Sequence, residues 1–352
     1  MTEIKVSDFK KMVPEEWQGF LRKCSSSSYF CSSDYISGFT RVFIIGAYRN
    51  SKLVAASMVR LRKMLPGSRL YSGWMDAFII LPEEEPSKNE WKQKIVSELK
   101  TFAKEKSLIH LYISHWVRSN DLDLLVRNDF IPEKKWTIYL DLKKNDDQLL
   151  KEMDYNHRRA IKKSRQSDLR IENLHGSEAC AKIKLFSEIR RETQKRAVKK
   201  FRQSSMTLKS EDHLKHILES TYDTAWISFV FVEEKLAAAG LFVGHNNTVI
   251  YYLGGSDQSI ANKSFASYYL LFENFRYARQ KGFEIFDLGG IPVDPIKGDP
   301  AYGVYLFKKR FGGTIEQFSG GRLVLRKKLF KILNFLIDQK WLVRLVLRHQ
   351  KQ

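Results

Sequence analysis

The sequence predicts an α/β fold with mixed sheets, built as two similar halves of one chain. A run rich in β-branched and aromatic residues, a polar turn and a second apolar run occupy residues 42–57, and the same order returns at 226–240. Such paired runs are typical of β-hairpins. In each half an amphipathic helix and a further strand follow, at 91–114 and 266–289, where apolar residues recur at helical spacing before a new apolar run.

The two halves keep the same order and nearly the same spacing. The turns KLVAAS and KLAAAG begin at Lys52 and Lys235, and the helix ends AKEK and ARQK begin at Ala103 and Ala278. A charged turn, KKNDD, separates a predicted strand from a predicted helix between the halves, which is where domain boundaries tend to fall. We therefore expect a first domain at 1–145, a second at 146–321 and a basic amphipathic helical tail at 322–352.

Composition limits the classes of function. The 352 residues are 43% hydrophobic and carry a formal charge of +20, so global disorder is excluded and polyanions such as RNA, nucleotide diphosphates or an anionic membrane are favoured partners. A solvated basic surface is the alternative. Three cysteines without CxxC spacing indicate neither a disulfide framework nor a zinc site. A charged N-terminal segment and the lack of a long apolar stretch predict a cytoplasmic protein.

The basic charge is clustered. The segment YNHRRAIKKSRQS, at 155–167, predicts a helix carrying Arg158, Arg159 and Lys162, and RRETQKRAVKKFR follows at 190–202. Both segments are consistent with phosphate contact or with solvated helix faces. The tail has nine basic residues and one acid, with apolar positions on one helical face (Leu325, Leu329, Ile332, Leu333 and Leu336). A helix of this kind lies on an anionic membrane or docks on the protein core.

Familiar catalytic motifs are absent from the sequence. It contains no HExxH, GxSxG, Walker or GxGxxG pattern, which disfavours metallohydrolases, serine hydrolases, kinases and dehydrogenases. Isolated histidines on polar segments (His157, His175, His213 and His216) are expected at the surface. Aminolysis of an activated ester remains, because that reaction needs mainly alignment and a cation for the oxyanion.

A candidate for that cation lies in GVYLFKKRFGG, at 303–313, after a loop rich in Gly, Pro and Asp. Such a loop lets the backbone approach a ligand closely. Lys308 and Lys309 stand between Phe307 and Phe311, where a lysine would be held rigidly. An ordinary edge helix or strand shows the same alternation, so the spacing alone leaves both interpretations open.

Several blocks together resemble the FemAB, or peptidoglycan interpeptide-bridge, aminoacyltransferases. They are YFCSSDYISGF (29–39), NDFIPEKKWTIYLDL (128–142), HRRAIKKSRQSDLRI (157–171), TQKR (193–196), YYLGGSD (251–257), ASYYLLFENFRYARQKGFEIFDLGGI (266–291) and GVYLFKKRFGG. The resemblance covers roughly 28–320. It implies two tandem GNAT-like domains, an aminoacyl-tRNA donor, a nucleotide- or lipid-linked muramyl-peptide acceptor, and no metal or organic cofactor.

The resemblance also implies roles for particular residues. Lys308 would stabilise the tetrahedral oxyanion and Phe307 would shape the site, while Arg196 would contact precursor phosphate and Tyr252 would line the cleft. The stretch 182–222 is too short for the coiled-coil arm that many relatives carry, so a compact form is expected. Departures lie in the first half: YSGWMD (71–76) replaces an arginine-glycine-proline triplet, Ser32 replaces a glutamine, and Thr40 or Arg41 stands near an expected lysine.

Two other functions stay open. An acyl-CoA N-acyltransferase on the same scaffold is one, although SDQSIANKSFAS, at 256–267, lacks the glycines with which GNAT enzymes cradle the CoA pyrophosphate. A non-catalytic protein that binds RNA or a membrane surface is the other. We expect a monomer with peripheral contact to the inner face of the membrane.

Overall fold

The computed structural model describes residues 2–24, 27–64, 68–114, 120–201, 209–221, 223–298 and 301–338. The chain divides into two compact units, residues 1–134 with 318–352 and residues 135–317. The expected boundary at 145 lies inside the second unit, which begins at 135. The segment from 318 onward belongs to the first unit, whereas a separate tail from 322 was expected.

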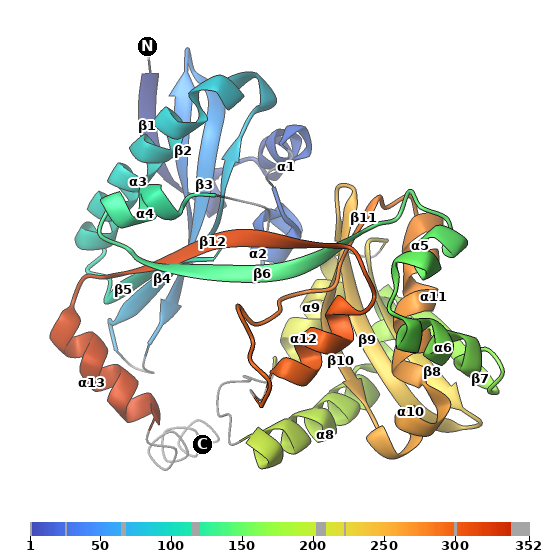
Figure 1. The fold of residues 1–352 in the computed structure, drawn as a ribbon. Helices are drawn as coiled ribbons and strands as arrows, with labels where there is room; N and C mark the ends of the chain where they lie inside the picture. The colour runs from blue at the N-terminus through green and yellow to red at the C-terminus, as the bar shows by residue number, and fades with distance from the viewer. Residues whose placement is uncertain are drawn as a thin grey trace. The chain divides into compact units, whose positions relative to one another are not determined.

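Unit 1 is a mixed sheet with strand order β1-β2-β3-β4-β5-β12 (Figure 1). Helix α3 buries Trp91, Ile95 and Leu99, and its Phe102 ring lies 5.0 Å from that of Phe43 on β2. The elements are β1 (Thr2–Asp8), β2 (Val42–Arg49), β3 (Lys52–Lys63), β4 (Tyr71–Ile80), β5 (His110–Ser114), β12 (Thr314–Val324), α1 (Pro14–Lys23), α2 (Ser33–Ile36), α3 (Lys88–Glu105), α4 (Leu122–Arg127) and α13 (Lys327–Asp338), with 3-10 turns η1 (Phe9–Lys11), η2 (Tyr29–Cys31) and η3 (Pro82–Ser87).

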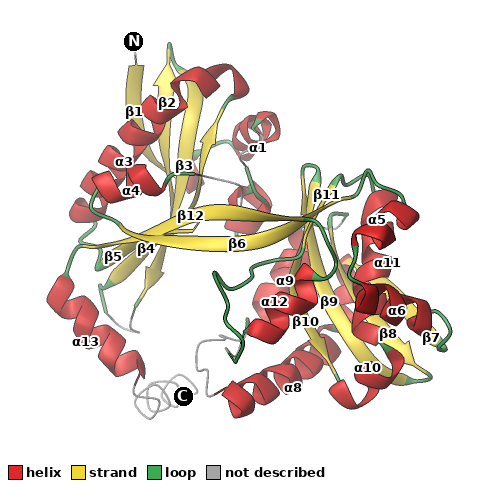
Figure 2. Ribbon diagram, viewed as in Figure 1, coloured by secondary structure: helices red, strands yellow, loops and turns green. Residues whose placement is uncertain are grey.

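Unit 2 has the strand order β6-β11-β10-β9-β8-β7 with helices on both faces (Figure 2). Helix α11 covers the face that carries Trp226 and Phe242, and α8 packs on the opposite face, where Phe186 meets Phe229. The elements are β6 (Ile131–Asp141), β7 (Leu169–His175), β8 (Ala225–Val232), β9 (Lys235–His245), β10 (Thr248–Ser256), β11 (Ile285–Asp287), α5 (Asp146–Glu152), α6 (Tyr155–Ser164), α7 (Gly176–Ala181), α8 (Ile183–Phe201), α9 (Glu211–Ser220), α10 (Gln258–Ser264), α11 (Ala266–Gln280) and α12 (Tyr302–Lys309).

The internal repeat is confirmed by the topology. In unit 1 the hairpin β2-β3 continues antiparallel into β4, and β5 then pairs parallel with β4 after helix α3. In unit 2 the hairpin β8-β9 continues antiparallel into β10, and β11 pairs parallel with β10 after α11. The predicted α/β class with two similar halves is therefore the observed one.

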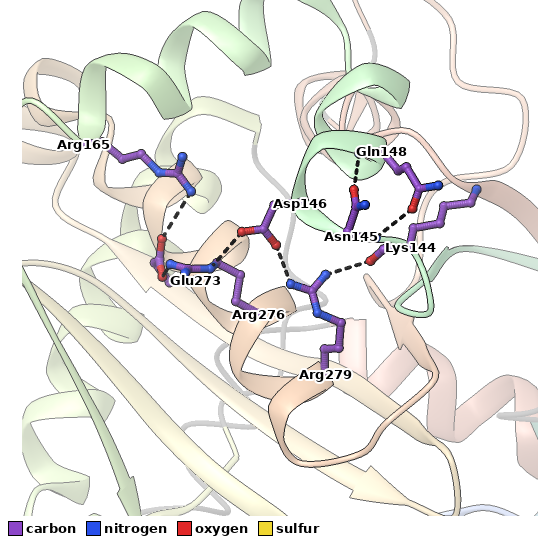
Figure 3. A network of polar contacts seen from close by, with 8 residues as sticks. All are labelled: Lys144, Asn145, Asp146, Gln148, Arg165, Glu273, Arg276 and Arg279. Atoms are coloured by element: carbon purple, nitrogen blue, oxygen red, sulfur yellow. Dashed lines mark hydrogen bonds and ion pairs between the residues drawn. The ribbon is translucent and has the colours of Figure 1, made fainter.

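A polar network fixes the start of α5 to the neighbouring helices of unit 2 (Figure 3). Asp146 accepts from Arg276 at 3.0 Å and from Arg279 at 2.5 Å, and Arg279 also donates to the Lys144 carbonyl at 2.7 Å. Asn145 caps the same helix through a reciprocal capping box with Gln148. These contacts fix the N-terminus of α5 to α11.

We expect Asp146→Ala to lower the free energy of unfolding by about 1 kcal/mol, because it removes two partly exposed ion pairs and an acid near the helix N-terminus. Urea denaturation measures the change. Asp147→Ala is the matched control, since Asp147 lies in the same first turn and is exposed. Equal effects of the two substitutions would show that the network adds nothing beyond the helix dipole.

The predicted tail is only partly a helix. Arg322 belongs to β12, where its backbone pairs with Tyr112 of β5. The Arg322 guanidinium also stacks on the Tyr112 ring, 5.4 Å from its centre. Helix α13 follows at Lys327–Asp338, and residues 339–352 lie outside the described chain together with the side chain of Leu336. Leu333 is buried and the Phe330 ring lies 5.1 Å from His110, so α13 docks on unit 1. None of the described helices has the length and apolarity that crossing a bilayer requires.

Candidate active site

Strands β10 and β11 separate where the candidate site lies. They pair only between residues 248–250 and 285–287, after which β10 runs on to Ser256 while the chain turns away after Asp287. Gly289 makes this turn with a φ of +75°, and a Cβ on it would lie 2.8 Å from the Tyr251 carbonyl oxygen. Only glycine allows so close an approach at this φ. Sites at the carboxyl ends of parallel strands are common in α/β proteins.

Lys308 lies at this point, in the last turn of α12. Its Nζ donates to the Gly290 carbonyl at 3.0 Å and lies 6.0 Å from the centre of the Tyr251 ring. Burial lowers the pKa of Lys308 to about 8, against the attraction of Asp287, which raises it. The ammonium is thus held in one place by a carbonyl and an aromatic ring, with donor capacity left for a further acceptor.

Asp287 organises the turn beneath Lys308. Its Oδ1 accepts from the Gly289 N–H at 2.7 Å and from the Thr137 hydroxyl of β6. Burial raises the pKa of Asp287 to about 6, while those two hydrogen bonds and the nearby Lys308 lower it. The sequence analysis assigned no role to Asp287 or Thr137. An aspartate at the end of a predicted strand, shortly before two glycines, could have indicated a turn held by the Asp287 carboxylate.

Phe307 points into the packed side of α12. Its ring lies 5.3 Å from Phe311 and 5.2 Å from Tyr268, and its carbonyl is 2.8 Å from His157 Nε2. Because a carbonyl only accepts, His157 carries its proton on Nε2. The expectation that His157 is a surface residue was wrong: it is 2% exposed, burial lowers its pKa, and its Nδ1 has no hydrogen-bond partner in the described part of the chain.

Arg196 and Thr193 bind the far end of β10. The Thr193 hydroxyl accepts from the Ser256 N–H at 2.9 Å, and the Arg196 guanidinium donates to the Ser256 carbonyl. Tyr252 stands between this end and Tyr251, at the point where the β9-β10 register shifts. Tyr252 thus belongs to β10, while Lys308 of α12 lies beside Tyr251 and Arg196 of α8 binds Ser256. All three predicted residues are therefore on, or in contact with, residues 251–256 of β10.

Of the predicted binding residues on α6, one has an internal structural role and two are exposed. Arg158 donates to the Met153 carbonyl at 2.6 Å and to the Lys151 carbonyl, so it closes the end of α5. Arg159 and Lys162 are exposed on the side opposite the buried His157 and Ile161. Residues 190–201 of the second basic run lie in α8. The side chains of 197–201, and residue 202 as a whole, lie outside the described residues.

The positions of unit 1 that differ from the expected family pattern contact other residues of the same unit. Ser32 caps α2 by accepting from the Tyr35 N–H at 3.3 Å, and Arg41 stacks on the Tyr71 ring at 4.6 Å. Asp76, in the YSGWMD segment, forms a buried ion pair with Arg60. Two cavities lie away from Lys308: one of about 410 Å³ borders Met12 and Tyr48, and one of about 350 Å³ borders Tyr139 and Glu284.

Comparison with solved structures identifies the class of fold. FemX superposes with a TM-score of 0.72 at 13% identity, over 94% of this chain and 99% of that one. L-PGS from Bacillus licheniformis gives 0.57 at 13% identity over 91% and 95%, and a tandem GNAT protein from the clavulanic acid biosynthesis pathway gives 0.53 at 9% identity over 91% and 98%. The predicted tandem GNAT-like architecture is confirmed.

The chain belongs to the FemAB family, whose model matches residues 127–230 and 227–337. Lipid II:glycine glycyltransferase of Staphylococcus epidermidis is 30% identical over 80 residues, which is 23% of this chain and 18% of that protein. The Staphylococcus aureus protein of the same name is 26% identical over 101 residues, 28% of this chain and 24% of its own length. These matches span about a fifth of the length of the curated relatives.

Proposed function

We propose that this protein is an aminoacyltransferase that moves an amino acid from a charged tRNA onto an amine of a peptidoglycan precursor, linked to a nucleotide or a lipid. The observation that carries the proposal is the Lys308 ammonium, held on the Gly290 carbonyl beside Tyr251 where β10 and β11 separate. Membership of the FemAB family and the named glycyltransferase relatives support it.

The chemistry requires one well-placed cation. The acceptor nitrogen attacks the ester carbonyl, a C–N bond forms and the carbonyl oxygen becomes an oxyanion. Lys308 Nζ, which has donor capacity beyond its bond to Gly290, stabilises that charge. The C–O bond to the ribose then breaks, and the surplus proton of the amine ends on the departing ribose oxygen. Phe307 contributes by fixing α12 through its packing and its bond to His157.

Charge on unit 2 favours RNA as the carrier of the donor. Arg159 and Lys162 are exposed on α6, and Lys195 is exposed on α8. In this proposal unit 2 holds the donor and the catalytic lysine and also contacts the acceptor. Arg196 keeps its bond to Ser256 and has further donors for a precursor phosphate. The enzyme works as a monomer.

Radiolabelled transfer tests the proposal. Purified protein with charged tRNA and a muramyl-peptide precursor should yield labelled precursor, and ribonuclease treatment of the donor before mixing should abolish it. Acetyl-CoA should give no product. Transfer from acetyl-CoA without a response to charged tRNA would contradict the proposed donor, and binding without turnover from either donor would contradict catalysis.

The structure gives one argument against CoA as the donor. Asp257 caps α10 by accepting from the Ser259 N–H at 2.8 Å and from the Ser259 hydroxyl at 2.6 Å. The hydroxyl bond, more than any other contact, holds the pKa of the Asp257 carboxyl below its usual range. A carboxylate therefore occupies the helix N-terminus that a pyrophosphate would need, and like charges repel there.

Contact with an anionic membrane is a further part of the proposal. Helix α13 leaves Ile332 54% and Phe335 63% exposed, and the basic residues Lys327, Lys328 and Lys331 are also exposed on it. Exposed apolar side chains among lysines suit the interface of an anionic bilayer. A lipid-linked acceptor would then be reached from the inner membrane surface.

Vesicle sedimentation measures this contact. The double variant Ile332→Ser with Phe335→Ser should bind phosphatidylglycerol vesicles about tenfold more weakly than the unsubstituted protein, because it removes two apolar side chains from the interface. Phosphatidylcholine vesicles serve as the uncharged control. Equal binding of both proteins to the anionic vesicles would assign the exposed side chains to another contact.

A further inference from the structure

Arg190 of α8 is a mostly buried cation that has no counter-charge among the described residues. It is 7% exposed, and burial lowers its pKa. Its guanidinium lies 5.8 Å from the Phe186 ring, but within the described chain it makes no hydrogen bond and no ion pair. The nitrogens of Arg190 are not among the fully buried, unpartnered side-chain atoms of the described residues, so the guanidinium keeps a narrow contact with solvent. An anion can reach it there, and a charge-assisted hydrogen bond at so enclosed a site is a strong one.

Its place in the fold is next to the candidate site. The backbone of α8 lies directly on β10, since a Cβ on Gly255 would meet the Ile189 carbonyl at 2.9 Å and Arg190 N at 3.0 Å. The phenols of Tyr252 and Tyr251 are near enough to oppose the lowering of the Arg190 pKa. Tyr251 is also the ring beside Lys308. Tyr251 is therefore close to both Arg190 and Lys308.

The chemistry of a guanidinium selects the ligand. Its planar fork matches the two oxygens of a carboxylate, and one enclosed arginine suits a single small anion better than an extended backbone of phosphates. RNA is normally followed by rows of exposed basic side chains, and those lie on α6. The acceptor in the proposed reaction is a peptide, which carries free carboxylates in the same molecule as its attacking amine.

We propose that Arg190 binds a carboxylate of the acceptor peptide and so orients the attacking amine toward Lys308. This inference rests on the proposed function and adds the part of the acceptor that is recognised. Arg190 has no ion-pair partner in the described part of the chain, and the arriving carboxylate supplies a counter-charge. Binding and alignment of the acceptor are thereby linked in one contact.

Calorimetric titration tests the contact without requiring turnover. The probes are a muramyl pentapeptide with free carboxylates and versions in which each carboxylate in turn is an amide. One amide should bind the unsubstituted protein about 10- to 100-fold more weakly, the range expected for a charged hydrogen bond. Arg190→Met should weaken binding of the free acid by a similar factor and show no additional loss with that amide.

Controls separate recognition from packing. Arg191→Met, the exposed neighbour on the same helix, should bind every probe like the unsubstituted protein. Arg190→Met should melt at an equal or higher temperature, because it removes an unpaired buried charge. The proposal is overturned if all amides bind as well as the free acid, if Arg190→Met binds the free acid normally, or if Arg190→Met weakens only binding of a tRNA minihelix.

The transfer assay keeps the two proposals apart. Carboxylate-dependent binding at Arg190 without transfer from charged tRNA would refute the aminoacyltransferase alone. Transfer that proceeds equally with free and amidated acceptors would refute the Arg190 contact alone.

Discussion

Lys308→Met slows single-turnover aminoacyl transfer about 100- to 1,000-fold, the loss typical of removing one oxyanion donor. Methionine keeps the length of the side chain and removes its charge. Binding of the charged tRNA should change little, because the cation acts on charge that appears only in the transition state. Quenched-flow measurement with enzyme in excess over donor gives the rate directly.

Lys309→Met is the matched control for that variant. Lys309 follows Lys308 in α12, is exposed, and stacks on Tyr305 at 5.2 Å. It faces away from Gly290, so its loss should leave the rate within about twofold, which is less than 0.5 kcal/mol of barrier. Similar losses in both variants would indicate a general charge effect on RNA binding and would remove Lys308 from the chemistry.

Gly289→Ala is expected to lower the free energy of unfolding by about 3 kcal/mol and to reduce transfer strongly. The added methyl group would sit at a φ of +75° and 2.8 Å from the Tyr251 carbonyl, so a backbone strain and a clash add together. Relief of the clash must move the turn, and with it the Gly290 carbonyl that holds Lys308. Thermal unfolding and the transfer rate report the two effects.

Gly303→Ala is the control for this substitution. Gly303 lies in the first turn of α12, and a Cβ there would meet no atom within 4 Å. Alanine favours a helix over glycine, so stability should be kept or slightly raised, with the rate unchanged. Unaltered stability of Gly289→Ala would show that the turn at Lys308 is softer than its contacts indicate.

The order of elements was predictable because it is local. Alternating β-branched residues and helical spacing mark β2, β3, β8, β9, α3 and α11, and the repeat of two short turns linked the halves. The unit boundaries were less predictable, because they depend on which sheet β12 joins. An arginine such as Arg322 is equally compatible with a strand and with a helix. Its stacking on Tyr112 is a long-range contact, which a local sequence pattern does not predict.

The site was predictable in part for the same reason. Lys308 and Tyr252 lie in distinctive sequence blocks, and the fold places Lys308 of α12 beside Tyr251, the neighbour of Tyr252 in β10. Asp287 and Arg190 were missed because what distinguishes them is their burial. In the sequence, an aspartate at the end of a strand and one arginine in a basic run do not differ from exposed residues of the same type. Arg158 shows the converse, since a basic residue in a promising run turned out to bind the carbonyls that end α5.

The pH dependence of single-turnover transfer tests the role of Lys308 most directly. Burial places the pKa of Lys308 near 8, and the ammonium form stabilises the oxyanion. The rate should therefore rise as the acceptor amine loses its proton and stop rising near pH 8, because loss of the Lys308 ammonium then offsets further deprotonation of the amine. Arginine stays charged across this range, so Lys308→Arg, though slower, should keep rising with pH beyond that point. A break at the same pH in both proteins would contradict a protonated Lys308 at the reacting ester.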